Sequence, residues 1–101
     1  MTLVFIPSPP SCYHLAGDAV STKAGVDETA FLHRRSARLA AHIRATAERM
    51  GLGFIDLRGP CLAASAERPL HGPRDWGHFN RAGYEVLARE LARHLEAQAG
   101  G

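Results

Sequence analysis

A carboxylate and an imidazole stand at a spacing suited to acid–base chemistry in one short stretch near the end of the chain. Asp75 precedes His78 by three residues, and a glycine and a tryptophan lie between them. In a loop, this spacing lets the carboxylate turn back and accept the Nδ1 proton of the imidazole, which leaves Nε2 free as a base. The sequence therefore predicts His78 as a general base and Asp75 as the residue that orients it.

An asparagine attaches this stretch to a helix. Asn80 is a good N-cap for the amphipathic segment that follows, from residue 81 to about residue 98. A general base must be held in place by its surroundings, so the attachment of the loop to a helix end suits a catalytic role. The apolar stripe expected on this helix consists of Tyr84, Leu87, Leu91 and Leu95.

The wider pattern Asp75-x-x-His78-x-Asn80-x-x-Gly83-Tyr84, followed by a terminal apolar helix, resembles the last conserved block of the SGNH/GDSL hydrolases. These are esterases, lipases and acyl-transfer enzymes on a flavodoxin-like three-layer α/β/α fold. In that family the Asp and His of this block belong to a Ser-His-Asp triad. The resemblance thus implies that His78 and Asp75 are catalytic, that the substrate is an ester or acyl compound (a small molecule or a carbohydrate), and that no cofactor or metal is needed.

The resemblance covers nearly the whole chain but only part of a family domain, so residues 1–101 are expected to be the C-terminal portion of a single SGNH-hydrolase-like domain. The family's first block, a strand followed by Gly-Asp-Ser, is not present, nor are the blocks that supply oxyanion donors. Gly17-Asp18-Ala19 has alanine where the nucleophile would stand. The serine nucleophile is therefore expected from elsewhere.

Two short apolar runs, residues 3–6 and 53–57, are typical of buried parallel strands. The segment between them predicts one long helix from about Asp27, as N-cap, to about Met50, with Gly51 as the glycine that ends it. Together they form a right-handed β-α-β unit with parallel strands. The apolar stripe of the long helix is expected from Leu32, Ser36, Leu39, Ile43, Ala47 and Met50.

After the second strand the sequence predicts a short helix, a loop and the terminal helix. Pro60 suits an early position of the short helix, which would end near residue 66, and Asp56 is expected to cap its first turn. Residues 68–79 form the loop that carries Asp75 and His78, with Trp76 and Phe79 as its apolar anchors onto the sheet. The expected fold class is α/β, with the order β-α-β-α-α and two short parallel strands.

Serines after the first strand are the nearest hydroxyl groups to this edge of the sheet. Ser8 and Ser11 follow residues 3–6, where parallel sheets form their ligand crevice. They either line a pocket or belong to an ordinary polar turn. Neither precedes a glycine-rich turn that would supply oxyanion donors.

Composition excludes several other classes of protein. The 101 residues carry a formal net charge of +2, and their arginines lie mainly on two helical stretches, which does not indicate nucleic-acid binding. No apolar run reaches the length of a membrane span, and no basic segment followed by an apolar one indicates a signal peptide. Cys12 and Cys61 are too few for a disulfide scaffold; they are either two buried thiols or one disulfide.

A metal site is the alternative to the catalytic interpretation. His71, Asp75 and His78 lie within one loop, but no further ligand stands at a helical or Cys-x-x-Cys spacing. His33 and His42 are not spaced as a metal-binding pair on a helix. The catalytic interpretation is therefore favoured.

Two hypotheses of different classes follow. In the first, the chain is part of a serine hydrolase, completed by a segment that brings the nucleophile. In the second, it is a non-catalytic remnant or interaction module, in which the Asp–His pair only ties the loop to the last helix. In both, the first strand would have an open apolar edge, available to a second copy or to a complementing chain.

Overall fold

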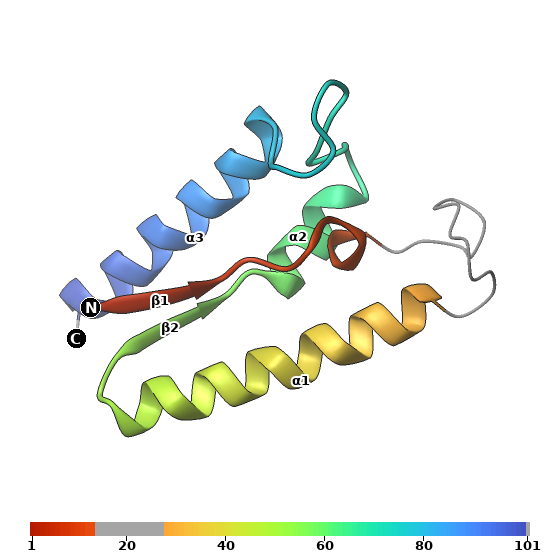
Figure 1. Cartoon of the computed structure of the whole chain (residues 1–101). Helices are drawn as coiled ribbons and strands as arrows, with labels where there is room; N and C mark the ends of the chain where they lie inside the picture. Colours follow the sequence, from red (N-terminus) through yellow and green to blue (C-terminus); the bar gives the residue numbers. More distant parts are fainter. Residues whose placement is uncertain (14–27, 101) are drawn as a thin grey trace.

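The computed structural model describes residues 1–13 and 28–100. Its elements follow one another in the order β-3₁₀-α-β-α-α (Figure 1). They are β1 (Thr2–Phe5), the 3₁₀ helix η1 (Pro9–Cys12), α1 (Glu28–Arg49), β2 (Gly53–Asp56), α2 (Arg58–Ser65) and α3 (Arg81–Gly100). The mixed α/β class predicted from the sequence is confirmed.

The two strands form a parallel sheet, as predicted. Thr2 is opposite Gly53, and Phe5 is opposite Asp56. Two further hydrogen bonds extend the pairing at both ends, from Gly53 N–H to the Met1 carbonyl (3.1 Å) and from Leu57 N–H to the Phe5 carbonyl (3.0 Å). Each strand has its partner on one side only, so the outer edge of β1 pairs with no other strand in the described part of the chain.

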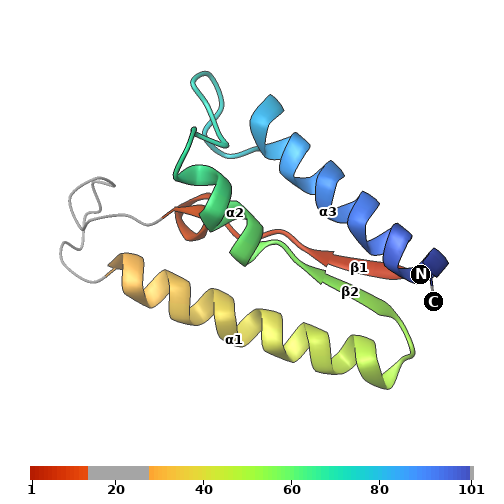
Figure 2. The same cartoon turned by 180° about the vertical axis from the view of Figure 1, so that it is seen from behind.

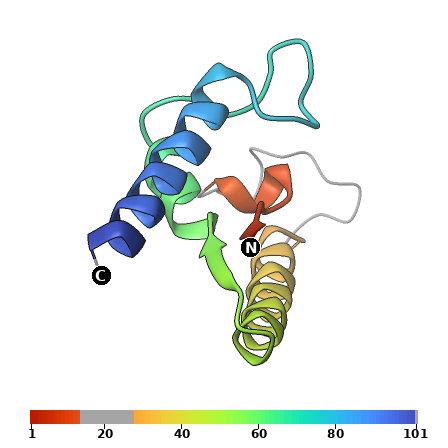
Figure 3. The same ribbon diagram turned by 90° about the vertical axis from the view of Figure 1, so that its left-hand side faces the viewer.

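Helices α1 and α3 cover opposite faces of this sheet. The strands lie between the two helices in Figure 1 and again in the reverse view of Figure 2. The view along the strands separates the three layers most clearly, with α3 on one side and α1 on the other (Figure 3). Both strands end on the side of the molecule where η1, α2 and the loop before α3 gather, so this loop sits at the carboxyl edge of the sheet (Figure 1).

Helix α1 ends as the sequence predicted, at a glycine. Gly51 has a φ of +70°, a left-handed conformation that glycine adopts without the steric cost of a Cβ. The predicted N-cap, Asp27, and the Gly17-Asp18-Ala19 sequence lie outside the described residues.

The predicted apolar stripe of α1 is correct only in part. Ser36 and Ala47 are buried, and Leu32 and Ile43 are half-buried, but Leu39 and Met50 are 49% and 66% exposed. Ala40, which the stripe left out, is buried instead. A two-stranded sheet is narrower than the face of the helix, so small side chains meet the strands and larger ones extend past the edge.

The core is small and lies toward the carboxyl edge of the sheet. Its buried members come from five parts of the chain: Cys12, Ile55, Leu57, Cys61, Leu70 and Val86. The predicted stripe of the terminal helix is correct only in part. Val86, not included in the predicted stripe, is 2% exposed, whereas Tyr84 and Leu95 are 56% and 61% exposed; Leu87 and Leu91 pack against the core. The helix runs from Arg81 to Gly100, close to the predicted range of 81 to about 98.

The reason for the difference in the stripe is again the width of the sheet. The first turns of α3 contact the loop before it, and His94 of a later turn lies 3.4 Å from Thr2 of β1, but two strands cover only part of the helix face. None of the helices in the described part of the chain is long and apolar enough to cross a membrane.

Candidate functional site

Asp75 and His78 are hydrogen-bonded, which confirms the predicted contact. The His78 Nδ1–H donates to Asp75 Oδ2 at 2.7 Å, and the Gly77 N–H donates to Asp75 Oδ1 at 2.8 Å. Both side chains are open to solvent, with exposed fractions of 78% for His78 and 61% for Asp75. With Nδ1 directed at the carboxylate, the lone pair of the neutral imidazole lies at Nε2, the atom at which a general base accepts a proton.

These hydrogen bonds also set the charge state of Asp75. The bond from His78, followed by the bond from the Gly77 N–H, lowers the pKa of Asp75 below its ordinary value. Asp75 is therefore ionised at neutral pH and attracts the positive charge that the imidazole gains on taking up a proton.

Asn80 holds both ends of the loop that carries the pair. Its Oδ1 accepts the Gly83 N–H at 3.1 Å, which confirms the predicted N-cap of α3. Its Nδ2 donates to the Pro69 and Gly72 carbonyls, both at 3.2 Å, and its backbone N–H donates to the Leu70 carbonyl at 2.8 Å. One side chain thus fastens the start of the loop to the first turn of the helix.

The predicted anchors behave differently from each other. Phe79 is half-buried and packs against the core, as expected. Trp76 is 60% exposed and does not pack on the sheet; its ring lies against the backbone of Gly72, where an added Cβ would come within 2.6 Å of it. Gly72 has a φ of +76°, so glycine is required there both for conformation and for space.

A second histidine of the loop lies in the interior, which the sequence did not reveal. His71 is 3% exposed, and its Nδ1 is 2.7 Å from the hydroxyl oxygen of Tyr13. The same hydroxyl accepts the Leu70 N–H at 2.9 Å. Tyr13 and His71 are 58 residues apart, so no local pattern indicated their contact.

This arrangement answers the question of a metal site. In the described part of the chain, no group of three or more His, Cys, Asp or Glu side chains is placed to hold a metal ion. His71 is directed at Tyr13 in the interior, while Asp75 and His78 face solvent. The three residues of the loop therefore do not converge.

No serine hydroxyl of the described residues is hydrogen-bonded to His78. Ser8 and Ser11 are hydrogen-bonded to each other at 3.2 Å, and Ser11, which is buried, also donates to the Leu32 carbonyl of α1 at 3.5 Å. Ser65 donates to Leu62 within α2, at 3.0 Å. Ser36 is buried on α1. Ser21 lies outside the described residues.

The remaining polar predictions concern Asp56 and the cysteines. Asp56 accepts the Arg58 N–H at 3.0 Å at the start of α2, as predicted, and forms an ion pair with the Arg58 guanidinium at 2.7 Å. Burial raises the pKa of Asp56, but the hydrogen bonds from Arg58 outweigh this effect and lower the pKa overall.

Cys12 and Cys61 are free, buried thiols of the core. The neighbouring Cys61 thiol and burial raise the pKa of Cys12, which makes it a poor nucleophile.

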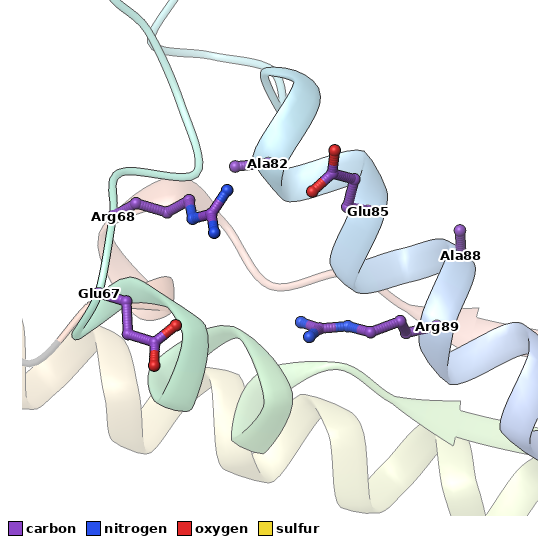
Figure 4. Close-up of a pocket in the computed structure, with 6 residues that line it drawn as sticks. All are labelled: Glu67, Arg68, Ala82, Glu85, Ala88 and Arg89. Carbon is purple, nitrogen blue, oxygen red and sulfur yellow. The ribbon is translucent and has the colours of Figure 1, made fainter.

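A charged cleft of about 350 Å³ lies between α2 and α3. Figure 4 shows the side chains of Arg68 and Arg89 extending into it from opposite sides, with Glu67 and Glu85 beside them. Its two positive and two negative groups give it no preference for an ion of one sign. None of the predicted site residues lines it.

Comparisons of the chain with protein-family models, with curated proteins and with solved structures gave no significant match.

Proposed function

We propose that this chain supplies the histidine and aspartate of a serine hydrolase or acyltransferase that acts on esters. In the proposed reaction a serine Oγ attacks the carbonyl carbon of the substrate, His78 Nε2 takes the hydroxyl proton, and Asp75 stabilises the imidazolium. The proton then passes to the leaving alcohol as the acyl-serine forms. Water or a second alcohol releases the acyl group by the same steps, again with His78 as base.

The observation that carries this proposal is an ordered Asp–His pair that is open to solvent. Its 2.7 Å hydrogen bond directs Nε2 away from the carboxylate, and the 78% exposure of His78 leaves room for a hydroxyl and a substrate. The SGNH/GDSL resemblance of the same residues supports the assignment. It also points to an ester or acyl substrate, of a small molecule or of a carbohydrate.

The nucleophile and the oxyanion donors must come from another segment. In the described part of the chain no serine hydroxyl is hydrogen-bonded to His78. Ester hydrolysis also needs preorganised donors at the developing oxyanion. The chain is therefore one portion of the proposed site.

The free edge of β1 is the place where such a segment would add to the fold. A groove of about 460 Å³ lies between the end of β1, with the residues that follow it, and α1. It is lined by the apolar side chains of Phe5, Ile6, Leu32 and Leu39 and by Ser8, Arg35 and Ser36. The buried Ser36 hydroxyl, which lines the same groove, has no hydrogen-bond partner in the described part of the chain. An added strand would satisfy the backbone of β1 and cover this groove. The edge also fits a second copy of the chain. Sedimentation of the purified chain measures its oligomeric state and so distinguishes self-association from binding of a different segment.

The non-catalytic alternative assigns the Asp–His pair the task of tying the loop to the last helix. The hydrogen bonds that fasten this loop belong instead to Asn80 and to Tyr13. The Asp–His bond closes only the tip of the loop. This distribution favours a catalytic role for the pair.

A serine-directed fluorophosphonate probe tests the proposal in cells that produce the protein with a tag on this chain. We expect a probe-labelled serine on a segment that co-purifies with the chain or belongs to the same polypeptide. The His78→Ala variant should lose the labelling while keeping the association, and Arg74→Ala, in the same loop, should keep both. Labelling that is equal in wild type and His78→Ala would refute the proposal, and so would a co-purified segment that carries no reactive serine.

A further inference from the structure

The Tyr13 hydroxyl connects the segment after β1 to the start of the loop that carries Asp75 and His78. It lies 2.7 Å from His71 Nδ1 and accepts the Leu70 N–H at 2.9 Å. Leu70 is fully buried and His71 nearly so, with exposed fractions of 0% and 3%. The half-buried Tyr13 side chain thus makes its polar contacts with two buried residues.

The protonation states of the two rings agree with this arrangement. Burial lowers the pKa of His71, against a smaller opposing effect of the Asp75 carboxylate, so the imidazole is neutral at neutral pH. Burial raises the pKa of Tyr13, so the phenol keeps its proton. A hydroxyl that accepts from Leu70 and donates its own proton to a neutral Nδ1 satisfies all three groups.

The backbone at His71 is connected to the backbone at both members of the Asp75–His78 pair. On one side, the N–H of the next residue, Gly72, donates to the Asp75 carbonyl at 2.9 Å. On the other side, His71 forms a β-bridge with Phe79, the residue next to His78, and the two rings are 5.2 Å apart. A shift of His71 would therefore move the backbone next to both members of the pair.

We propose that Tyr13 is a positioning residue for the Asp75–His78 pair. Its hydroxyl fixes His71 and Leu70, and through them it sets the position from which His78 presents Nε2. The inference rests on the proposed function, in which Nε2 must meet a hydroxyl brought by another segment. Catalytic groups need placement within about 0.5 Å, and a displacement of about 1 Å can cost about a hundredfold in rate. Tyr13 follows η1, which leads from the end of β1, so it connects the loop to the strand with which the added strand would pair.

The tautomer of His78 reports the position of the pair without any catalysis. The Asp75 carboxylate holds the proton on Nδ1, whereas an imidazole without such a partner favours the Nε2–H form. Nitrogen chemical shifts of the histidine rings at pH 8, where an ordinary imidazole is neutral, distinguish the two forms. The Asp75→Ala variant provides the reference for a lost contact.

Two variants break the Tyr13–His71 bond from opposite ends. Tyr13→Phe removes the hydroxyl, and His71→Phe removes its acceptor with an apolar ring suited to the interior. We expect the Nδ1–H form in wild type and a shift toward the Asp75→Ala spectrum in both variants. Tyr84→Phe is the matched control, because Tyr84 is 56% exposed and should leave the tautomer unchanged.

The combination of outcomes separates this inference from the proposed function. Wild-type nitrogen shifts at His78 in the folded variants would refute the positioning role, and either variant decides the matter if the other fails to fold. Faster exchange of the Leu70 amide with an unchanged His78 tautomer would show a purely structural contact. A changed tautomer, together with probe labelling that does not depend on His78, would uphold the positioning role and refute the catalytic one.

Discussion

Some side chains hold the loop before α3 in place, and others are exposed at its tip. Asn80 and Tyr13 make hydrogen bonds to backbone groups of residues that lie far from them in the chain. Asp75 and His78 bond to each other at the solvent-exposed tip. A structural role and a catalytic role for the pair therefore predict different effects of substitution on stability.

We predict that His78→Ala leaves the free energy of unfolding within about 0.5 kcal/mol of wild type, as for other exposed side chains. Asn80→Ala should lower it by about 1–3 kcal/mol, because it removes a helix cap and two bonds to loop carbonyls. Asn80→Asp, which keeps the capping oxygen but not the donor, should fall between them. Urea denaturation followed by circular dichroism measures all three.

A loss for His78→Ala as large as that for Asn80→Ala would show that the Asp–His pair fastens the loop. The non-catalytic hypothesis would then account for the pair without any reaction.

Helix α3 meets the loop more closely than its sequence suggests. A Cβ added to Gly83 would lie 2.4 Å from the Phe79 ring and 2.6 Å from the Leu70 carbonyl oxygen. The glycine of the Asn-x-x-Gly pattern thus lets the first turn of the helix approach the start of the loop. This contact brings Phe79 into the core while its neighbour His78 remains outside.

We predict that Gly83→Ala destabilises the protein by about 1–3 kcal/mol, although alanine is the better helix former, because Phe79 and the loop must shift. Gly59→Ala is the matched control within another helix, α2, where nothing lies within 4 Å of the added Cβ. Because Pro60 disfavours a helical alanine before it, this variant should lose the advantage of a better helix former and stay within about 0.5 kcal/mol of wild type. Thermal melts of both variants against wild type provide the comparison.

A Gly83→Ala variant as stable as Gly59→Ala would show that α3 has room for a side chain at position 83. The close packing of α3 on the loop would then be wrong.

The molecule as a whole has layers on both sides of a sheet that is only two strands wide. Large apolar side chains of α1 and α3 extend past the strands, and the edge of β1 has no partner among the described residues. Sheets this narrow are marginal by themselves. Among residues 1–13 and 28–100, no serine hydroxyl is hydrogen-bonded to His78.

We predict that the purified chain shows no serine-dependent turnover of p-nitrophenyl acetate above background, since oxyanion donors and a nearby hydroxyl are needed. A small rate should remain that falls in His78→Ala, because an exposed imidazole attacks this activated ester directly. Ser8→Ala and Ser11→Ala should leave it unchanged. Initial rates followed at 400 nm are sufficient for the comparison.

A large rate that disappears in His78→Ala and also in one of the serine variants would contradict this expectation. The chain would then contain a complete active site.

The order of the strands and α-helices and the hydrogen bonds of Asp75, His78 and Asn80 followed from the sequence, whereas the 3₁₀ helix η1 did not. Apolar runs determined the two strands, a glycine determined the end of α1, and the spacing of Asp75, His78 and Asn80 determined a bonded pair next to a helix cap. These are local properties: they depend on side chains within a few residues of one another, for which sequence spacing fixes distance. The catalytic role of the pair and the family resemblance stay predictions.

Tertiary structure alone decided which faces are buried and what holds the loop. Periodicity assigned Leu39, Tyr84 and Leu95 to the interior, but a sheet of two strands covers less than a whole helix face, and Ala40 and Val86 are buried instead. The contact of Tyr13 with His71 joins residues 58 positions apart and has no local signature. Such contacts depend on how the layers pack, which no short stretch of sequence contains.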